Sequence, residues 1–206
     1  MKQHIARALI VAISLVAACS DYSKSPTYPS PSTSTGRDTT TTTGPQYDRQ
    51  GVPHRVAFGF NGTASGFPKG AVFLTGGGSY DPATASNVVG DTTTDVKSGG
   101  GFRCIDGVEQ GPLNHCARDV GVRWDTAQLL ASAPFKCTAS DAVKTAVTGR
   151  DRVVLNADFY RAGDGNEESF HAQMIVSATD LAPNIPGNQT LWIQGVGCAE
   201  ATVNFN

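Results

Sequence analysis

The sequence predicts an all-β domain over residues 51–206, an antiparallel β-sandwich or barrel-like fold with two disulfides and at most short helices. Three observations lead to this fold class. Short runs rich in Val, Ile, Phe, Tyr and Thr are separated by Gly, Pro, Asn and Asp, which is typical of strands joined by turns. Signals for helices are weak. The domain also holds four cysteines, an even number that is typical of disulfide-bonded exported proteins.

Residues 1–18 have the pattern of an export signal. Lys2 and Arg7 form a short basic start, and residues 8–17 are apolar except for Ser14. An apolar run of this length suits a signal peptide and is too short for a bilayer span, which needs about 20 residues. The sequence therefore predicts that residues 1–18 are removed on export.

The junction Val16-Ala17-Ala18-Cys19 resembles the lipobox of bacterial lipoproteins, in which small residues precede an obligatory cysteine. The resemblance implies a diacylglyceryl group on the Cys19 thiol, cleavage before Cys19 and acylation of the new amino terminus, with palmitate as a typical chain. Ser20 follows where an aspartate would resemble an inner-membrane retention signal, so an outer membrane is favoured if the cell has one. The alternative is an ordinary secretory signal that leaves Cys19 free or paired.

Residues 19–50 predict a lipidated cysteine followed by a disordered tether. The stretch from Ser20 to Gln50 holds 6 Ser, 8 Thr and 4 Pro and lacks Val, Leu, Ile and Phe. Because it has so little apolar surface to bury, it has no means of offsetting the entropy lost on ordering. We expect it to act as a spacer between a membrane and the domain.

The charge of the chain argues against nucleic acid as a partner. The 16 Lys and Arg residues are outnumbered by 18 Asp and Glu, whereas a nucleic-acid binder needs a basic surplus. Removal of residues 1–18 leaves 14 basic against 18 acidic residues, a net charge of −4. Anionic lipid would repel such a chain mildly, so we expect membrane attachment to depend on the acyl chains of Cys19.

The domain is expected to contain nine strands and two short helical turns. The helical turns are expected over Thr126–Ala131 and Asp141–Ala146, where a proline or a capping serine bounds them. The expected strands are Arg55–Asn61, Ala71–Thr75, Gly101–Cys104, Gly121–Trp124, Phe135–Thr138, Arg152–Tyr160, Ser169–Ser177, Thr190–Val196 and Ala201–Phe205.

A hairpin around Asp164-Gly165 is the clearest local prediction. This dipeptide favours a type I′ turn, and centring the turn on it sets the register of the two flanking strands. One face then carries only apolar pairs, whereas a slip by one residue would mix polar and apolar residues. The expected apolar pairs are Phe159–Phe170, Ala157–Ala172, Leu155–Met174 and Val153–Val176, and the pairs on the other face are Asp158–His171, Asn156–Gln173 and Val154–Ile175.

The four domain cysteines allow three disulfide connectivities, and we favour one. Cys104–Cys116 would close a short Gly- and Pro-containing loop, and Cys137–Cys198 would join distant strands. A metal site is the alternative, but the cysteines lack CxxC spacing and only His115 lies beside one of them. We therefore expect structural disulfides, no bound metal and no cofactor.

Asp158, Ser169 and His171 are weak catalytic candidates. The predicted hairpin places them on one face, and they are the residue types of an acid, a nucleophile and a base. The sequence has no G-x-S-x-G motif and no recognisable oxyanion hole. A cross-strand ion pair on a solvated face explains the same residues, so no catalytic residue is assigned.

Several glycine-rich or acidic segments resemble ligand loops only superficially. Residues 164–168 lack the order of a calcium loop and fit a polar hairpin tip. The triple glycines at 76–78 and 99–101 lack the spacing and the lysine of a phosphate loop. We expect these glycines to mark bulges, bends or close approach of backbones.

Arg123, Trp124 and Trp192 are weak binding candidates. Tryptophan beside polar residues suits the face of a sugar or a peptide. The alternative is packing in the core with a cation–π contact.

Four strings of residues in the domain carry a second resemblance. The strings are FGFN at 58–61, LTGGGSYDP at 74–82, SGGGFRC at 98–104 and DFYRAGDG at 158–165. Together they resemble an uncharacterised family of exported bacterial proteins over most of residues 55–206. The family has no assigned chemistry, so the resemblance implies export and no site residue.

These features together predict a lipid-anchored cell-envelope protein whose extracytoplasmic β domain is a binding or structural module. Its expected partners are the membrane, through the anchor, and an envelope ligand or protein. The sequence offers no convincing catalytic set, so we do not expect an enzyme. The alternatives are an envelope hydrolase that uses the Asp158/His171 face, or a metal-stabilised module.

Overall fold

Nine antiparallel strands form a single sheet that closes on itself. The computed structural model describes residues 55–161 and 169–206. The strand order is β10-β9-β8-β7-β4-β3-β2-β1-β11, and β10 also pairs with β1 through Ser65 and Cys198. The strands are β1 (Val56–Ser65), β2 (Ala71–Tyr80), β3 (Val96–Asp106), β4 (Arg123–Leu129), β7 (Arg152–Tyr160), β8 (Ser169–Ser177), β9 (Gln189–Ile193), β10 (Gly197–Glu200) and β11 (Thr202–Phe205).

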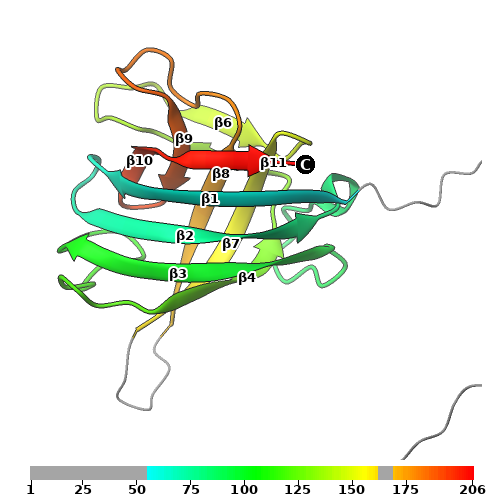
Figure 1. Cartoon of the computed structure of the whole chain (residues 1–206), viewed down its shortest axis with the longest axis horizontal. Helices are drawn as coiled ribbons and strands as arrows, with labels where there is room; N and C mark the ends of the chain where they lie inside the picture. The colour runs from blue at the N-terminus through cyan, green and yellow to red at the C-terminus, as the bar shows by residue number, and fades with distance from the viewer. Residues whose placement is uncertain (1–54, 162–168) are drawn as a thin grey trace, which may run out of the picture. The chain divides into compact units, whose positions relative to one another are not determined.

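The predicted all-β class is confirmed, and its form is a barrel. β10 and β11 are separated only by Ala201 and together occupy one position in the ring. In Figure 1, β11, β1, β2 and β3 form the near side, and β7 and β8 cross behind them at a steep angle. A short hairpin, β5 (Ser132–Phe135) with β6 (Lys144–Val147), forms a separate two-stranded sheet.

The β7–β8 hairpin has the register that the sequence predicts. Every expected pair is present, from Val153 opposite Val176 to Phe159 opposite Phe170. The expected strands 152–160 and 169–177 also match the observed ones residue for residue. The predicted turn at Asp164-Gly165 and the acidic segment 164–168 lie outside the described residues.

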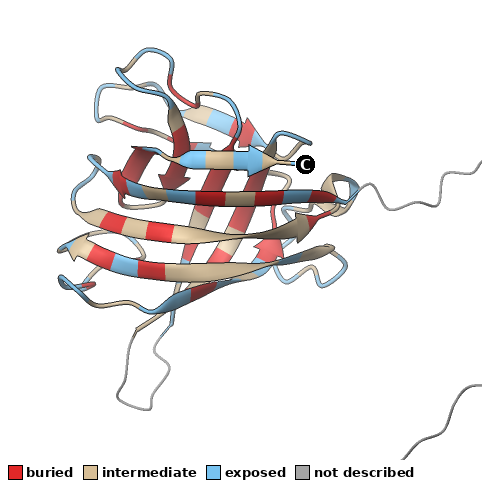
Figure 2. Ribbon diagram, viewed as in Figure 1, coloured by how far each residue is buried: buried red, intermediate tan, exposed pale blue. Residues whose placement is uncertain are grey.

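Side chains alternate between the interior of the barrel and its outer surface. Figure 2 shows buried positions alternating with half-buried or exposed ones along most of the strands. In β7, Val153 packs in the interior while its neighbour Val154 joins a second apolar cluster. The interior is filled largely by aromatic and aliphatic side chains, among them Phe58, Phe60, Tyr80, Phe102, Trp124, Leu155, Phe159, Met174 and Ile193.

The two expected helical turns are wrong. Thr126–Leu129 belongs to β4, where pairing with β7 overrides the helix propensity of Ala and Leu. The register shifts between Thr126 and Gln128, so that Leu129 faces the interior and Leu130 faces the second cluster. Residues 141–146 form an irregular segment and part of β6, and the one helix among the described residues is a short 3-10 turn, Pro82–Thr84.

Both expected disulfides are present. Cys104 is bonded to Cys116, and Cys137 is bonded to Cys198. The first bridge closes the loop that follows β3. The second links the β5–β6 connection to β10, across 61 residues of sequence.

The two triple-glycine segments lie opposite each other in β2 and β3. Gly76 pairs with Gly100, and Gly77 pairs with Gly99. A methyl group added at Gly76 would lie 2.6 Å from the Trp124 ring. The expected close approach is therefore confirmed, and it makes room for a core tryptophan.

Candidate functional site

The outer face of β4, β7, β8 and β9 carries three rows of side chains that differ in polarity. The apolar row is Val154, Ile175 and Trp192. The carboxamide row is Gln128, Asn156, Gln173 and Gln194, in which the backbone N–H of Gln194 donates to the carbonyl of Gln173 at 2.9 Å. The charged row is Asp125, Asp158 and His171. Strand register alone produces these rows, because residues opposite each other across a sheet share a face.

The β5–β6 hairpin covers the apolar row. Phe135 packs edge-on against Trp192 with ring centroids 6.1 Å apart, and the Trp192 indole N–H donates to the Lys136 carbonyl at 2.9 Å. Trp192 is consequently only 6% exposed. Together with the Cys137–Cys198 bridge, these contacts fix the hairpin to the barrel.

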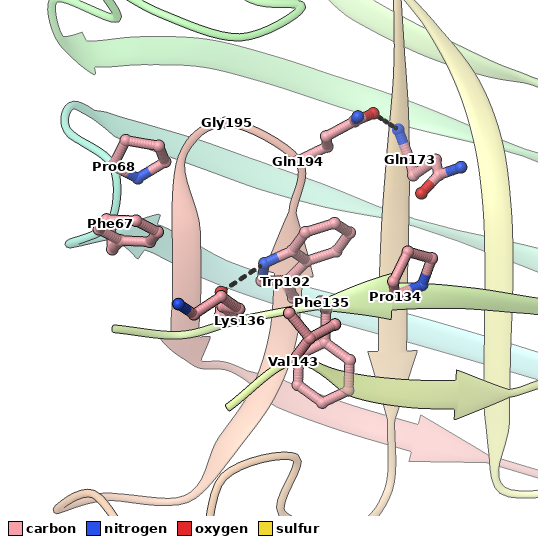
Figure 3. A pocket seen from close by; sticks show the side chains of 10 residues that line it. All are labelled: Phe67, Pro68, Pro134, Phe135, Lys136, Val143, Gln173, Trp192, Gln194 and Gly195. Carbon is pink, nitrogen blue, oxygen red and sulfur yellow. Dashed lines mark hydrogen bonds between the residues drawn. The ribbon is translucent and has the colours of Figure 1, made fainter. Parts of the chain in front are cut away.

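A groove of about 280 Å³ opens where the hairpin leaves β8 and β9 uncovered. We call it the Trp192 groove. Figure 3 shows Gln173 and Gln194 at one end, Phe67 and Pro68 at the other, and Trp192 between them. It is lined by Phe67, Pro68, Pro134, Phe135, Lys136, Val143, Gln173, Trp192, Gln194 and Gly195.

One cation lies at the rim of the Trp192 groove. The Lys136 ammonium stands 5.7 Å from the centroid of the Phe67 ring. It also donates to the Ala139 carbonyl at 2.9 Å. The ring and the carbonyl thus hold this ammonium in place, and its charge is the only formal charge among the groove's lining residues.

A second hollow of about 330 Å³ lies on the other side of Gln173. We call it the carboxamide hollow. Pro134 and Gln173 line both hollows, so the two are contiguous. The lining of the carboxamide hollow is neutral and rich in amides: Asn87, Val89, Gln128, Leu130, Ser132, Pro134, Asn156 and Gln173.

The four carboxamides differ in how much hydrogen-bonding capacity the protein uses. Gln128 donates its amide to the carbonyls of Ser86 and Val88, at 3.0 and 2.7 Å. Gln194 accepts from the Gln173 backbone N–H at 3.1 Å. The side chains of Asn156 and Gln173 have no hydrogen-bond partner among residues 55–161 and 169–206, and both are half-buried.

The catalytic candidates come together only in part. His171 Nδ1 and Asp158 Oδ1 are 2.5 Å apart, so the predicted cross-strand pair is formed. The His171 side chain is 66% exposed, in keeping with a solvated face. Ser169 lies on the same strand and shares no hydrogen bond with His171 in the described structure. An acid and a base are therefore adjacent here, without a nucleophile joined to them.

The two tryptophans have different surroundings, and neither forms a platform with Arg123. Trp124 is fully buried inside the barrel, where its indole N–H donates to the Thr75 carbonyl at 3.1 Å. Arg123 points outward because it precedes Trp124 in the strand, and it stacks over Tyr160 at 4.5 Å. Trp124 is thus a core residue, whereas Trp192 borders a groove.

Within the described ranges, no group of three or more His, Cys, Asp or Glu side chains is arranged to hold a metal ion. His115 lies in the loop closed by the Cys104–Cys116 bridge, beside the Asn114 amide. His54 lies outside the described residues.

The carboxamide row is a candidate functional feature that sequence reasoning misses. Pairing of Asn156 with Gln173 follows from the predicted hairpin. Gln128 could not be added because a helical turn was expected there, and Gln194 was expected inside a strand rather than at its end. The available signal was a polar carboxamide in or just after each of the strands β4, β7, β8 and β9, which are neighbours in the sheet although β5 and β6 separate β4 from β7 in the chain.

Comparisons with protein families, curated proteins and solved structures find no match to this chain. Across the residues that the structure describes, no helix has the length and apolar character needed to cross a membrane.

Proposed function

We propose that this chain is a lipid-anchored protein of the bacterial cell envelope whose β domain is a binding module. The contiguous hollows beside the β5–β6 hairpin carry this proposal, because they expose carboxamides whose hydrogen bonds the protein itself leaves unused. Asn156 and Gln173 are half-buried without a described protein partner, so their amides can hydrogen-bond a ligand in place of water. Concave sites with a few placed polar groups are typical of ligand binding.

The anchor is proposed from the lipobox resemblance at Val16–Cys19. Two or three acyl chains hold a protein on a membrane stably, whereas one chain holds it only marginally. The two disulfides fit an oxidising compartment outside the cytoplasm. Ser20 after the cysteine favours the outer membrane in a cell with two membranes.

Metabolic labelling with palmitate tests the anchor. We expect label on the wild-type chain and none on Cys19→Ala, because the thioether and the new amino terminus both require Cys19. Ser20→Asp is the matched control: it should keep the label, since it leaves the acylated residue intact. Label that persists in Cys19→Ala would refute the anchor.

Capture from solubilised envelope extracts tests the binding role. The bait is the full chain in detergent, compared with Phe67→Ala, which removes one wall of the Trp192 groove from the loop between β1 and β2. We expect at least one envelope component to be retained by the wild type and lost from the variant. Identical captured sets, with both baits folded by circular dichroism, would contradict a binding role for this groove.

A further inference from the structure

We infer that the carboxamide row binds an uncharged, β-linked glycan chain lying across strands β4, β7, β8 and β9. This inference rests on the proposed binding role and names the class of ligand. Three features of the outer face carry it: unused hydrogen-bonding groups, their spacing, and the neutral, partly aromatic walls of the two hollows.

The unused groups match the chemistry of sugar hydroxyls. A carboxamide offers two donors and one acceptor, and a hydroxyl both donates and accepts. Asn156 and Gln173 keep all of these groups free of described partners. Gln194 has its oxygen engaged, and its amide nitrogen has no described partner, whereas Gln128 has its nitrogen engaged and is only 6% exposed. The row therefore presents both donors and acceptors, as a hydroxyl-bearing or acetamido-bearing chain requires.

The spacing of the row favours a glycan over an extended peptide. The four carboxamides lie on neighbouring strands, which are about 4.8 Å apart. One pyranose unit of an extended β-1,4-linked chain is close to this length. Successive units are flipped, but each ring carries hydroxyls on both edges, so hydroxyls face the row once per unit. An extended peptide presents groups on one side only every second residue, roughly 6.6 Å apart. A peptide also has no open strand edge to join here, because β7 and β8 are each paired on both sides.

The walls of the hollows suit a neutral ring. Among the lining residues of both hollows, Lys136 alone is charged. At its end of the site, Phe67, Pro68 and Val143 provide apolar surface for the carbon-bound face of a sugar, whereas Phe135 and Trp192 are almost fully buried and add little. At the other end, Val89 is 96% exposed and borders the carboxamide hollow. A chain lying along the row would thus meet amides below it and apolar side chains at both ends.

Binding of defined oligosaccharides to the full chain in detergent micelles tests the inference. The probes are the β-1,4-linked tetramer of N-acetylglucosamine and cellotetraose, with tetra-alanine as the extended peptide. The test variant is Asn156→Leu/Gln173→Met, which removes the two free carboxamides at similar side-chain size. The matched control is Asn61→Leu, an exposed carboxamide on β1, on the opposite part of the ring.

We expect saturable binding of at least one of the two oligosaccharides to the wild type. The double variant should bind it about tenfold more weakly, because two neutral hydrogen bonds are lost. The affinity of Asn61→Leu should equal that of the wild type. Equal affinity in wild type and double variant would overturn the inference, as would the absence of saturable binding of both sugars. If tetra-alanine binds more tightly than either sugar and the double variant loses this binding, a glycan is refuted as the ligand, while the domain is still supported as a binding module. The capture experiment with Phe67→Ala tests the proposed binding role separately from the class of ligand.

Discussion

At the residue scale, Trp124 depends on two glycines for its place in the barrel. Its ring faces Gly76 and Gly100, which pair with each other across β2 and β3. A methyl group at Gly100 would lie 2.8 Å from the indole nitrogen and 2.0 Å from the Thr75 carbonyl oxygen. That carbonyl also accepts the indole hydrogen bond, so both the ring and its partner would have to move.

Gly100→Ala should therefore lower the free energy of unfolding by about 3 kcal/mol, the upper part of the range for overpacked cores. Its neighbour provides a matched control, because a methyl group at Gly101 would meet its nearest atom at 3.5 Å, an ordinary contact. Gly101→Ala should change stability by no more than about 0.5 kcal/mol. Urea unfolding of both variants checks this, and equal losses would contradict the role of Gly100 in seating Trp124.

Tyr80 is the second residue whose burial has a measurable consequence. Its hydroxyl donates to the Gly149 carbonyl at 2.7 Å and to the Arg152 carbonyl at 3.2 Å. Burial raises the pKa of the Tyr80 phenol strongly, and the negative charge of Asp151 raises it further. The folded protein therefore keeps this proton at pH values where an unfolded tyrosine releases it.

Stability should consequently fall as the pH rises beyond about 10, where unfolded tyrosine ionises. The sign follows because the unfolded chain loses the proton first, so higher pH favours unfolding. In Tyr80→Phe the alkaline fall should be shallower. The variant should also lose about 1–3 kcal/mol, because the Gly149 carbonyl loses its bond from the hydroxyl, while the Arg152 carbonyl keeps the Gly149 N–H as a donor. Urea unfolding at several alkaline pH values checks this, and parallel pH profiles for the two proteins would count against the assignment.

At the scale of elements, the β5–β6 hairpin converts an outer face of the barrel into a second core. Without it, Val154, Ile175 and Trp192 would face solvent on the outside of the sheet. Its loop is also tied to residue 184, where the Asn184 amide donates to Asp141 at 2.7 Å and accepts from Lys144 at 2.6 Å. The Asn184 hydrogen bond lowers the pKa of the exposed Asp141 carboxyl. The hairpin thus forms one wall of the Trp192 groove and borders the carboxamide row.

Removal of the two disulfides should have different effects on the free energy of unfolding and on hydrogen exchange in the β5–β6 hairpin. In the chain-entropy account, a bridge across 61 residues contributes about 4 kcal/mol and one across 12 residues about 3 kcal/mol. Cys137→Ala/Cys198→Ala should also speed hydrogen exchange in β5 and β6, because it frees the hairpin from β10. Cys104→Ala/Cys116→Ala is the matched control and should leave exchange in the hairpin unchanged. Hydrogen exchange read by mass spectrometry, with urea unfolding, measures both effects, and unaltered protection of β5 and β6 in the first variant would refute the coupling.

At the scale of the whole molecule, closure of the sheet decides where a ligand can bind. β1 pairs with β2 on one side and with β11 and β10 on the other, so the described sheet forms a ring. Its interior is occupied by packed aromatic and aliphatic side chains. The proposed binding site therefore lies on the outer surface, where the two contiguous hollows border the β5–β6 hairpin.

Features that depend on residues close together in the chain could be predicted from the sequence. Alternation around Asp164-Gly165 predicts the β7–β8 register pair by pair, because a slip of one residue would bury polar side chains. The even cysteine number and their loop lengths predict the two bridges. The same local logic failed at Thr126–Ala131, where good helix formers pair as a strand because tertiary contacts outweigh propensity.

Which distant residues share a surface could not be predicted without the fold. The pairing of two triple-glycine segments, the burial of Trp124 between them and the assembly of Gln128, Asn156, Gln173 and Gln194 into one row all depend on the order and register of strands far apart in the chain. Strand order is set by the packing of the closed ring, which no local pattern encodes. The proposed amino-terminal signal is the opposite case. Its pattern is a short run of consecutive residues, so the sequence alone predicts the anchor, whereas the candidate site depends on the fold.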